Sequence, residues 1–222
     1  MAPVRIPLFP LHTVLFPGSA LPLRVFEPRY RTMMADVLGP DEDPLPDARF
    51  GVACIREGLE VGTYAETHAI GCLGVVRWVR RHPDGTMELI VHGTRRFRID
   101  VRLPEEPYPR AEVTALEEPA GRDAAEALRL AGGAMTRYRE AIGRIAGQPL
   151  PELELGDEPV AASYQAAAAL RLEPPVHQSL LEAPDASRRL ALAASIARSE
   201  ASILETVGLP MVRPPIRGGS QN

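Results

Sequence analysis

The chain has 222 residues, of which 45% are apolar and 24% charged, the composition of an ordinary globular protein with one domain or two small ones. Its net charge of −4 argues against general attraction to nucleic acid or to an anionic membrane. All 25 basic side chains are arginine, which excludes a phosphate-binding P-loop lysine, a lysine Schiff base and a Ser–Lys dyad.

The first predicted elements lie in an apolar stretch, residues 4–30, that carries no charge between Arg5 and Arg24. Four prolines in this stretch, at positions 7, 10, 17 and 22, each remove a backbone donor and disfavour helix. The stretch is therefore predicted to be extended, and neither a signal peptide nor a membrane anchor. We expect a cytoplasmic protein without a membrane partner.

A strand and a helix are predicted where this stretch ends. Period-two alternation places Leu21, Leu23 and Val25 on one face of a strand that follows turn residues 16–19. Pro28 suits the first position of a helix over residues 28–38, because its missing N–H would be unpaired there anyway.

The next part of the chain is predicted to be strands joined by turns. The expected strands cover residues 50–55, 59–61 (pairing back on 50–55), 63–73, 74–81, 86–92, 95–103 and 111–116. His82-Pro83-Asp84-Gly85 is a strong hairpin turn. In the strand over 95–103, alternation predicts two faces, with Phe97, Ile99, Val101 and Leu103 inward and Arg96, Arg98, Asp100 and Arg102 outward.

From Glu117 to Gly121 the apolar period changes from two to about 3.6, which predicts a helical half. The expected helices cover 123–146, 158–170 (capped by Asp157), 174–182 and 186–207 (capped by Asp185). The apolar stripe predicted for the last helix consists of Leu192, Ile196, Ser199, Ile203 and Val207. The residues alone thus predict an α+β chain, with a β part over 1–118, a helical bundle over 119–209 and a flexible tail over 210–222.

The chain resembles the Lon protease N-terminal (substrate-binding) domain family, which includes stand-alone bacterial proteins and the related domain of cereblon. The match runs to about residue 207 and is carried by spaced motifs in one order: Pro7-Leu8-Phe9-Pro10-Leu11, Val14-Leu15-Phe16-Pro17-Gly18, Leu21-Pro22-Leu23, Phe26-Glu27-Pro28-Arg29-Tyr30, Phe50-Gly51-Val52, Val61-Gly62-Thr63, Ile70-Gly71 and Gly93-Thr94-Arg95-Arg96-Phe97-Arg98. The resemblance implies a PUA-like β pseudo-barrel followed by an α-helical bundle.

The family also implies a function. In full-length Lon proteases this domain precedes an ATPase and a serine–lysine protease, and it is implicated in recognising substrates. Neither the ATPase nor the protease domain is found in these 222 residues. We therefore expect a stand-alone, non-catalytic module that binds unfolded or peptide segments of other proteins, as an adaptor or regulator in proteolysis. Its oligomeric state and client stay open.

A search for catalytic and metal-binding patterns supports the non-catalytic reading. The five histidines lack the H-x-x-x-H and H-E-x-x-H spacings, and no serine lies in G-x-S-x-G. Cys54 and Cys72 are predicted to be buried thiols, not a disulfide, in keeping with a cytoplasmic chain. We therefore predict no catalytic set, no metal and no cofactor.

RNA binding is the alternative function, suggested by the one concentration of arginines in the chain. These are Arg77, Arg80, Arg81, Arg95, Arg96, Arg98 and Arg102. Alternation scatters them over both sheet faces among acidic residues, and only Trp78 offers a stacking surface nearby. A solvated sheet face is favoured, so nucleic acid is not an expected partner.

Two groups of residues are the predicted sites. The candidate peptide-binding residues are Phe9, Leu11, Phe16 and Trp78, since prolines and turns prevent the first three from all pointing inward. The second group is an ion pair of structural or ligand-binding role, with candidates Glu27, Arg29, Arg96 and Arg98. Glu27 is predicted to accept hydrogen bonds from the first-turn amides of its helix and to pair with Arg95, Arg96 or Arg98.

Overall fold

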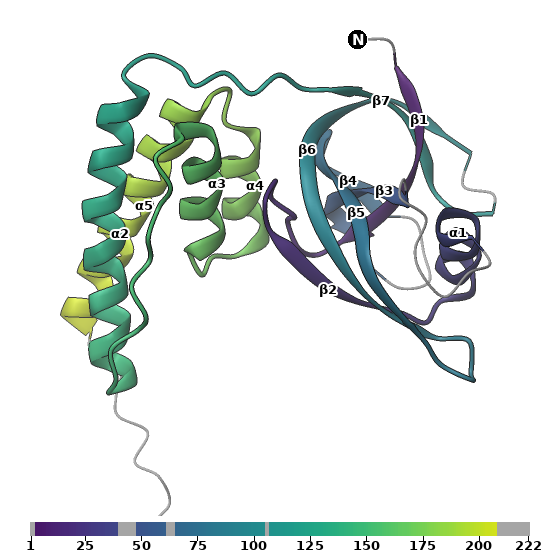
Figure 1. The fold of residues 1–222 in the computed structure, drawn as a ribbon, viewed down its shortest axis with the longest axis horizontal. Coiled ribbons are helices and arrows are strands. Elements are labelled where there is room, and N and C mark those ends of the chain that lie inside the picture. The colour runs from purple at the N-terminus through teal and green to yellow at the C-terminus, as the bar shows by residue number, and fades with distance from the viewer. Residues whose placement is uncertain (1–2, 40–47, 61–64, 105–106, 208–222) are drawn as a thin grey trace, which may run out of the picture.

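A computed structural model describes residues 3–39, 48–60, 65–104 and 107–207, and the predicted tail lies outside these ranges. The strands and one helix form a β half, and four helices form a helical half beside it (Figure 1). The elements are β1 (Val4–Leu11), β2 (Ala20–Val25), α1 (Pro28–Leu38), β3 (Arg49–Gly58), β4 (Ala65–Thr67), β5 (Ile70–Arg81), β6 (Met87–Leu103), β7 (Arg110–Ala115), α2 (Ala124–Ala146), α3 (Pro159–Ala169), α4 (Pro174–Glu182) and α5 (Ala186–Val207).

The β half is a closed ring of five strands. Its order is β1-β7-β6-β5-β3, and β1 closes the ring by pairing in parallel with β3 while its first residues pair antiparallel with β7. The ring is visible in Figure 1, where β1, β6 and β7 surround its open end. Outside it, β2 extends the sheet along β6, and β4 pairs with β3. The predicted α+β fold, a β pseudo-barrel followed by helices, is confirmed.

The interior of the ring is filled by one small core cluster. All five ring strands contribute to its surroundings, and its buried members are Ile6, Leu8, Phe97, Ala111 and Val113. Glycines make the room: a Cβ on Gly51 would lie 2.8 Å from Phe97 Cζ, and one on Gly71 would lie 2.6 Å from it. The Phe97 ring therefore occupies the space that side chains on β3 and β5 would otherwise take.

A second core lies outside the ring, between the sheet and α1. It gathers Tyr30, Met33, Met34 and Leu38 of the helix with apolar side chains of β1, β2, β3, β5 and β6. The helix begins at Pro28, as predicted, and ends where Gly39 adopts a φ of 75°. This packing holds the end of β2 and the start of α1 against the sheet.

Three strand predictions need correction. The long strands β5 and β6 are each continuous, whereas each was expected as two pieces. A register shift between Ile99 and Val101 turns Val101 outward, so it is exposed and not part of the core. The strand that turns back to pair with β3 is Ala65–Thr67, while Leu59 lies outside any strand and Val61 lies outside the described residues.

The helical half is organised around close contact between the parallel helices α2 and α5 (Figure 1). The predicted stripe of α5 is only partly right: Leu192 and Ile196 pack against the core, but Ser199 and Ile203 are exposed. The fully buried apolar residues of α5 are Ala186, Leu190, Ala193, Ala194, Ala197 and Ala201. Alanines allow the two backbones to approach, so the smallest apolar side chains define the buried face. Among the described residues, no helix has the length and apolar character needed to cross a membrane.

Candidate functional site

Three of the four predicted peptide-binding residues are buried. Phe9, Leu11 and Phe16 are at most 5% exposed, so the prediction that they form an exposed patch is wrong. Phe9 stacks on Tyr30 with ring centroids 4.2 Å apart, and Leu11 belongs to the same core beneath α1. The second core and the helical half supply covering surfaces that alternation along one strand did not reveal.

Phe16 lies where the two halves meet. Its ring belongs to the core of the helical half, 6.3 Å from the ring of Tyr164 and 5.6 Å from that of His177, which it meets edge-on. His177 Nε2 lies 3.0 Å from the carbonyl oxygen of Leu170, so the neutral ring donates to it. The turn after β1 is therefore anchored in the helical bundle.

Acid is expected to weaken this junction. Burial lowers the pKa of His177, although the Leu170 carbonyl opposes that shift. Because its folded pKa lies below the unfolded value of about 6.5, the unfolded state binds the proton more readily and stability falls as pH drops below that value. Urea unfolding from pH 7.5 to pH 5 should show a smaller loss for His177→Gln than for the wild type. His12→Gln, at an exposed position, should reproduce the wild-type slope.

A buried arginine ties β6 to the helical half. The side chain of Arg96 is 3% exposed, and its Nε and Nη2 lie 2.9 and 3.0 Å from the two carboxylate oxygens of Glu118. Its Nη1 donates to the carbonyls of Leu181 and Ala183, both at 2.7 Å. The prediction that Arg96 faces solvent or pairs with Glu27 is therefore wrong.

A second buried arginine completes this network from the helical side. Arg189 is fully buried and donates to Ser163 Oγ and to the carbonyls of Leu180 and Ala183 at 2.8–3.2 Å. Its guanidinium lies 3.9 Å from the centre of the Tyr164 ring, and the Tyr164 hydroxyl donates to Glu118. Burial raises the pKa of Tyr164 and lowers that of Arg189. We call these four residues, Arg96, Glu118, Tyr164 and Arg189, the junction network.

The predicted ion pair at the start of α1 forms differently. Glu27 Oε2 lies 3.3 Å from Arg29 Nη2, and the Glu27 side chain makes no capping hydrogen bond to the first turn. Arg98 pairs with Asp100 on its own strand, at 3.1 Å. β2 ends at Val25, which pairs with Met87, so the helix start lies far along β6 from the arginines expected as its partners.

Trp78, the remaining predicted residue, lies in an exposed apolar row that crosses three strands. It is 45% exposed and pairs with Ile90 of β6, which is 41% exposed and pairs in turn with Pro22 of β2. Directly opposed residues share a face of the sheet. We call Pro22, Ile90 and Trp78 the apolar row; beside it lies a charged row of Arg24, Glu88 and Arg80.

The open edge of β2 favours contact through side chains over strand addition. In the part of the chain that the structure describes, β2 pairs only with β6. The bond from Gly93 N to Ser19 O shows that alternate residues, Ala20, Pro22 and Arg24, direct their backbone groups away from β6. Pro22 has no N–H to offer there, and prolines and charges are common protections of sheet edges.

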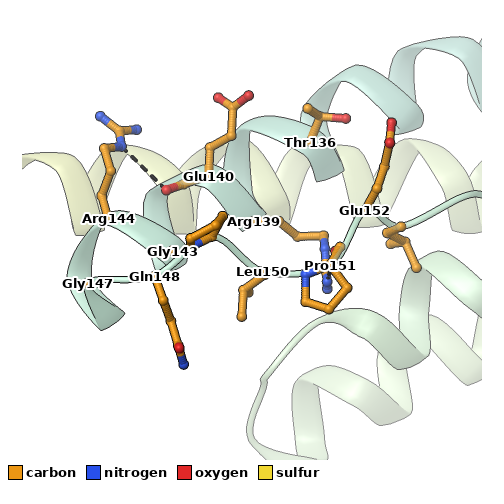
Figure 2. A pocket seen from close by; sticks show the side chains of 12 residues that line it. Thr136, Arg139, Glu140, Gly143, Arg144, Gly147, Gln148, Leu150, Pro151 and Glu152 are labelled. Carbon is orange, nitrogen blue, oxygen red and sulfur yellow. Dashed lines mark hydrogen bonds between the residues drawn. The ribbon is translucent and has the colours of Figure 1, made fainter.

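A groove lies between α2 and residues 147–153, with a volume of about 680 Å³. Figure 2 shows Arg139 reaching from α2 toward Pro151, whose carbonyl it binds, and Arg144 bonded to the Glu140 carbonyl at 3.4 Å. Arg144 also pairs with Glu205, and with Arg137 it lowers the pKa of that carboxyl to about 2. The arginines that line the groove are thus already paired with other groups of this chain.

The two cysteines are buried thiols that keep their protons. Cys54 and Cys72 are buried and free, as predicted, and burial raises their pKa values to about 11 and 12. Protonated buried thiols are poor nucleophiles and poor metal ligands. Across the described ranges, no three His, Cys, Asp or Glu side chains gather into a metal-binding group.

The sequence analysis missed most of the junction network. Of its four residues only Arg96 was a candidate, as a partner of Glu27, and none of Glu118, Tyr164 and Arg189 was singled out. One signal was available: Arg189 lies four residues before Ala193 and eight before Ala197, on the stripe that proves to be buried. A single charged residue in an alanine stripe marks a position whose partner must come from another element.

Comparison with known proteins gives one family. The model of the ATP-dependent protease La (LON) substrate-binding domain matches residues 5–198. Among curated relatives, Lon protease from Roseiflexus castenholzii is 30% identical over 214 residues, covering 93% of this chain and 25% of its own length. Lon protease 2 from Sorangium cellulosum is 31% identical over 147 residues, covering 65% of this chain and 17% of its own. The chain thus spans a quarter or less of these two relatives.

Two solved structures share the fold. The Lon N-terminal domain protein from Xanthomonas campestris superposes with a TM-score of 0.59 at 28% identity, over 84% of this chain and 95% of that one. The N-terminal domain of Mycobacterium avium complex Lon protease gives a TM-score of 0.58 at 20% identity, over 90% of this chain and 98% of that one.

Proposed function

Because the chain belongs to the family of the LON substrate-binding domain, we propose that it binds unfolded or peptide segments of other proteins without catalysing their breakdown, as an adaptor or regulator in proteolysis. The observation that carries this proposal is the apolar row. Three apolar side chains on neighbouring strands stay exposed, although the other face of the same sheet packs into the second core. Exposed contiguous apolar surface is typical of protein-interaction sites.

The composition of the row fits an extended apolar segment. Trp78 offers a large rigid surface, and aromatic residues are enriched among the side chains that dominate binding energy. The flanking Arg24 and Arg80 add a charged rim beside it. Because Pro22 has no N–H to donate at the open edge of β2, specificity would come from side-chain contact.

The test uses Trp78 as its own probe, since it is the single tryptophan of the chain. Titration with casein should shift its emission to the blue as the ring leaves water, and the casein should remain intact on a gel. In an anisotropy assay with labelled casein, Trp78→Ala combined with Ile90→Ser should weaken binding about tenfold or more. Ile203→Ser, which removes an equally exposed apolar side chain from α5, should leave it unchanged. Equal effects of the two variants would contradict the proposal.

RNA binding stays as a second candidate because arginines flank the one exposed tryptophan. Arg24 and Arg80 lie in the row beside Trp78, where a base could stack and phosphates could be bound. Glu88 lies between these two arginines, and the net charge of the chain is −4. Titration with a single-stranded RNA oligonucleotide in place of casein separates the two functions. RNA-dependent quenching of Trp78, weakened by salt, would favour the second candidate.

A further inference from the structure

The end of the ring where β1 begins and β7 ends contains a small pocket with apolar walls. Its volume is about 190 Å³, and the side chains that form it come from β1, β5, β6 and β7: Val4, Ile6, Leu73, Phe97, Val113 and Ala115. Phe97, Ile6 and Val113 are nearly fully buried, whereas Val4 is 54% exposed and therefore lies at the rim. The strands β1, β6 and β7 that border this end of the ring are labelled in Figure 1.

The pocket exists because the ring interior is filled unevenly. Deeper in the ring, Phe97 packs against Gly51 and Gly71, where no further side chain fits. Toward the open end, small residues such as Ala115 stand opposite Phe97 in the strand register and leave space. With roughly 30 Å³ for each water, the pocket would hold roughly six waters, or a single aliphatic or aromatic side chain.

Arginines stand at the rim of this apolar space. Arg95 pairs with Leu73, which pairs with Gly51, and Arg49 lies two residues before Gly51 on the same strand face. The two arginines therefore flank β5 across roughly 10 Å, twice the spacing of neighbouring strands. Both are exposed and line the pocket together with Arg96 of the junction network.

No acidic side chain is among the residues that line the pocket. The Arg49 side chain makes no hydrogen bond or ion pair with any residue in the described ranges. A planar guanidinium prefers a carboxylate, which it can bind through two parallel hydrogen bonds. The positive charge of Arg49 at the rim thus favours a ligand with an anionic group. The pocket walls favour an apolar group directly beside it.

We propose that this pocket binds the C-terminal residue of a protein partner, with its apolar side chain inside the ring and its carboxylate at Arg49. The reason is chemical: a C-terminal residue carries an apolar side chain and a carboxylate on one Cα, whereas an internal apolar residue carries none. The inference rests on the proposed protein-binding function and deepens it, because it adds recognition of a chain end to contact with the apolar row.

The first experiment needs no variant. A fluorescein-labelled hexapeptide with Gly-Ser-Gly-Ser-Ala-Leu and a free carboxylate is compared by anisotropy with the same peptide ending in an amide. The free acid should bind at least tenfold more tightly, and its affinity should fall with added salt. Replacing the final Leu by Ser should remove most of the binding, because serine buries almost no apolar surface against the pocket walls. Equal affinity for acid and amide would overturn the inference.

Two variants then place the binding at the ring. Arg49→Gln should weaken the free acid about tenfold and leave the amide unchanged, while Arg198→Gln on α5 serves as the matched control. Ala115→Phe should fill the pocket and abolish the preference for Leu; its Tm confirms that the ring is intact. If Arg49→Gln and Arg198→Gln behave alike, the inference fails. Casein binding that still depends on Trp78 would then leave the proposed function standing.

Discussion

Arg189→Met is expected to lower the free energy of unfolding by about 3–5 kcal/mol, measured by urea denaturation. The substituted side chain fills similar space, but Ser163 Oγ and the Leu180 carbonyl lose the N–H that Arg189 donates to them, and the Ala183 carbonyl keeps only its bond from Arg96. A buried polar group without a partner costs about 1–3 kcal/mol. Replacing a whole buried ionic cluster by apolar residues is often neutral, but here the acceptors and Glu118 stay behind.

The controls for this variant lie on the same helix and at the same position. Arg198→Met removes an exposed arginine from α5 and should change stability by less than about 0.5 kcal/mol. Arg189→Lys keeps a positive charge without the planar fork and should fall between the two variants. A loss for Arg189→Met no greater than that for Arg198→Met would show that the junction network contributes little to stability.

Gly93→Ala is expected to cost about 3 kcal/mol, near the upper end for overpacking a core. A Cβ at this position would lie 2.2 Å from the backbone oxygen of Phe16 and 3.1 Å from Cys72 Sγ. The backbone cannot yield easily, because Gly93 exchanges hydrogen bonds with Gly18 and Ser19, both at 2.9 Å. The substitution therefore forces the turn after β1 away from β6, and with it Phe16 out of the helical core.

A glycine without close neighbours gives the matched control. Gly133 lies within α2, and a Cβ there would meet no atom within 4 Å. Gly133→Ala should stabilise the protein by about 0.5–1 kcal/mol, because alanine loses less backbone entropy in a helix. The two variants differ only in location, so opposite shifts in Tm would test the close approach of β6 to the Phe16 turn. Shifts of the same sign would contradict it.

The elements that could be predicted from the sequence are those whose ends are marked by a few neighbouring residues. Pro28 and Gly39 bound α1, Asp185 Oδ1 accepts from Arg188 N at the start of α5, and the hairpin at residues 82–85 joins β5 to β6. One cap was displaced by a residue: Glu158, not Asp157, accepts the first amides of α3. These features depend on a few neighbouring residues, so a short window of sequence contains their physical cause.

The features that sequence analysis missed depend on contacts between distant segments. Phe9 and Leu11 are covered by α1, and Phe16 is covered by the helical half. Arg96 is buried because Glu118 and the end of α4 close over it. Trp78 stays exposed because nothing in the described chain packs on its face of the sheet. Alternation along a strand predicts which residues share a face, but not which face another element covers.

The ring closure has a consequence for how the chain is made. β1 leaves the ribosome before the other strands of the ring, yet Val4 pairs with Val113 of β7, the last strand of the β half to be synthesised. At about 5–20 residues per second, roughly 5–20 s separate the two. During that interval the prolines of β1 discourage it from forming a helix, and its first residues, Val4 to Pro7, lack their β7 partners. Such long-range pairing slows folding relative to the locally connected helices that follow. β1, the first strand of the ring to be synthesised, is therefore among the last to complete its pairing.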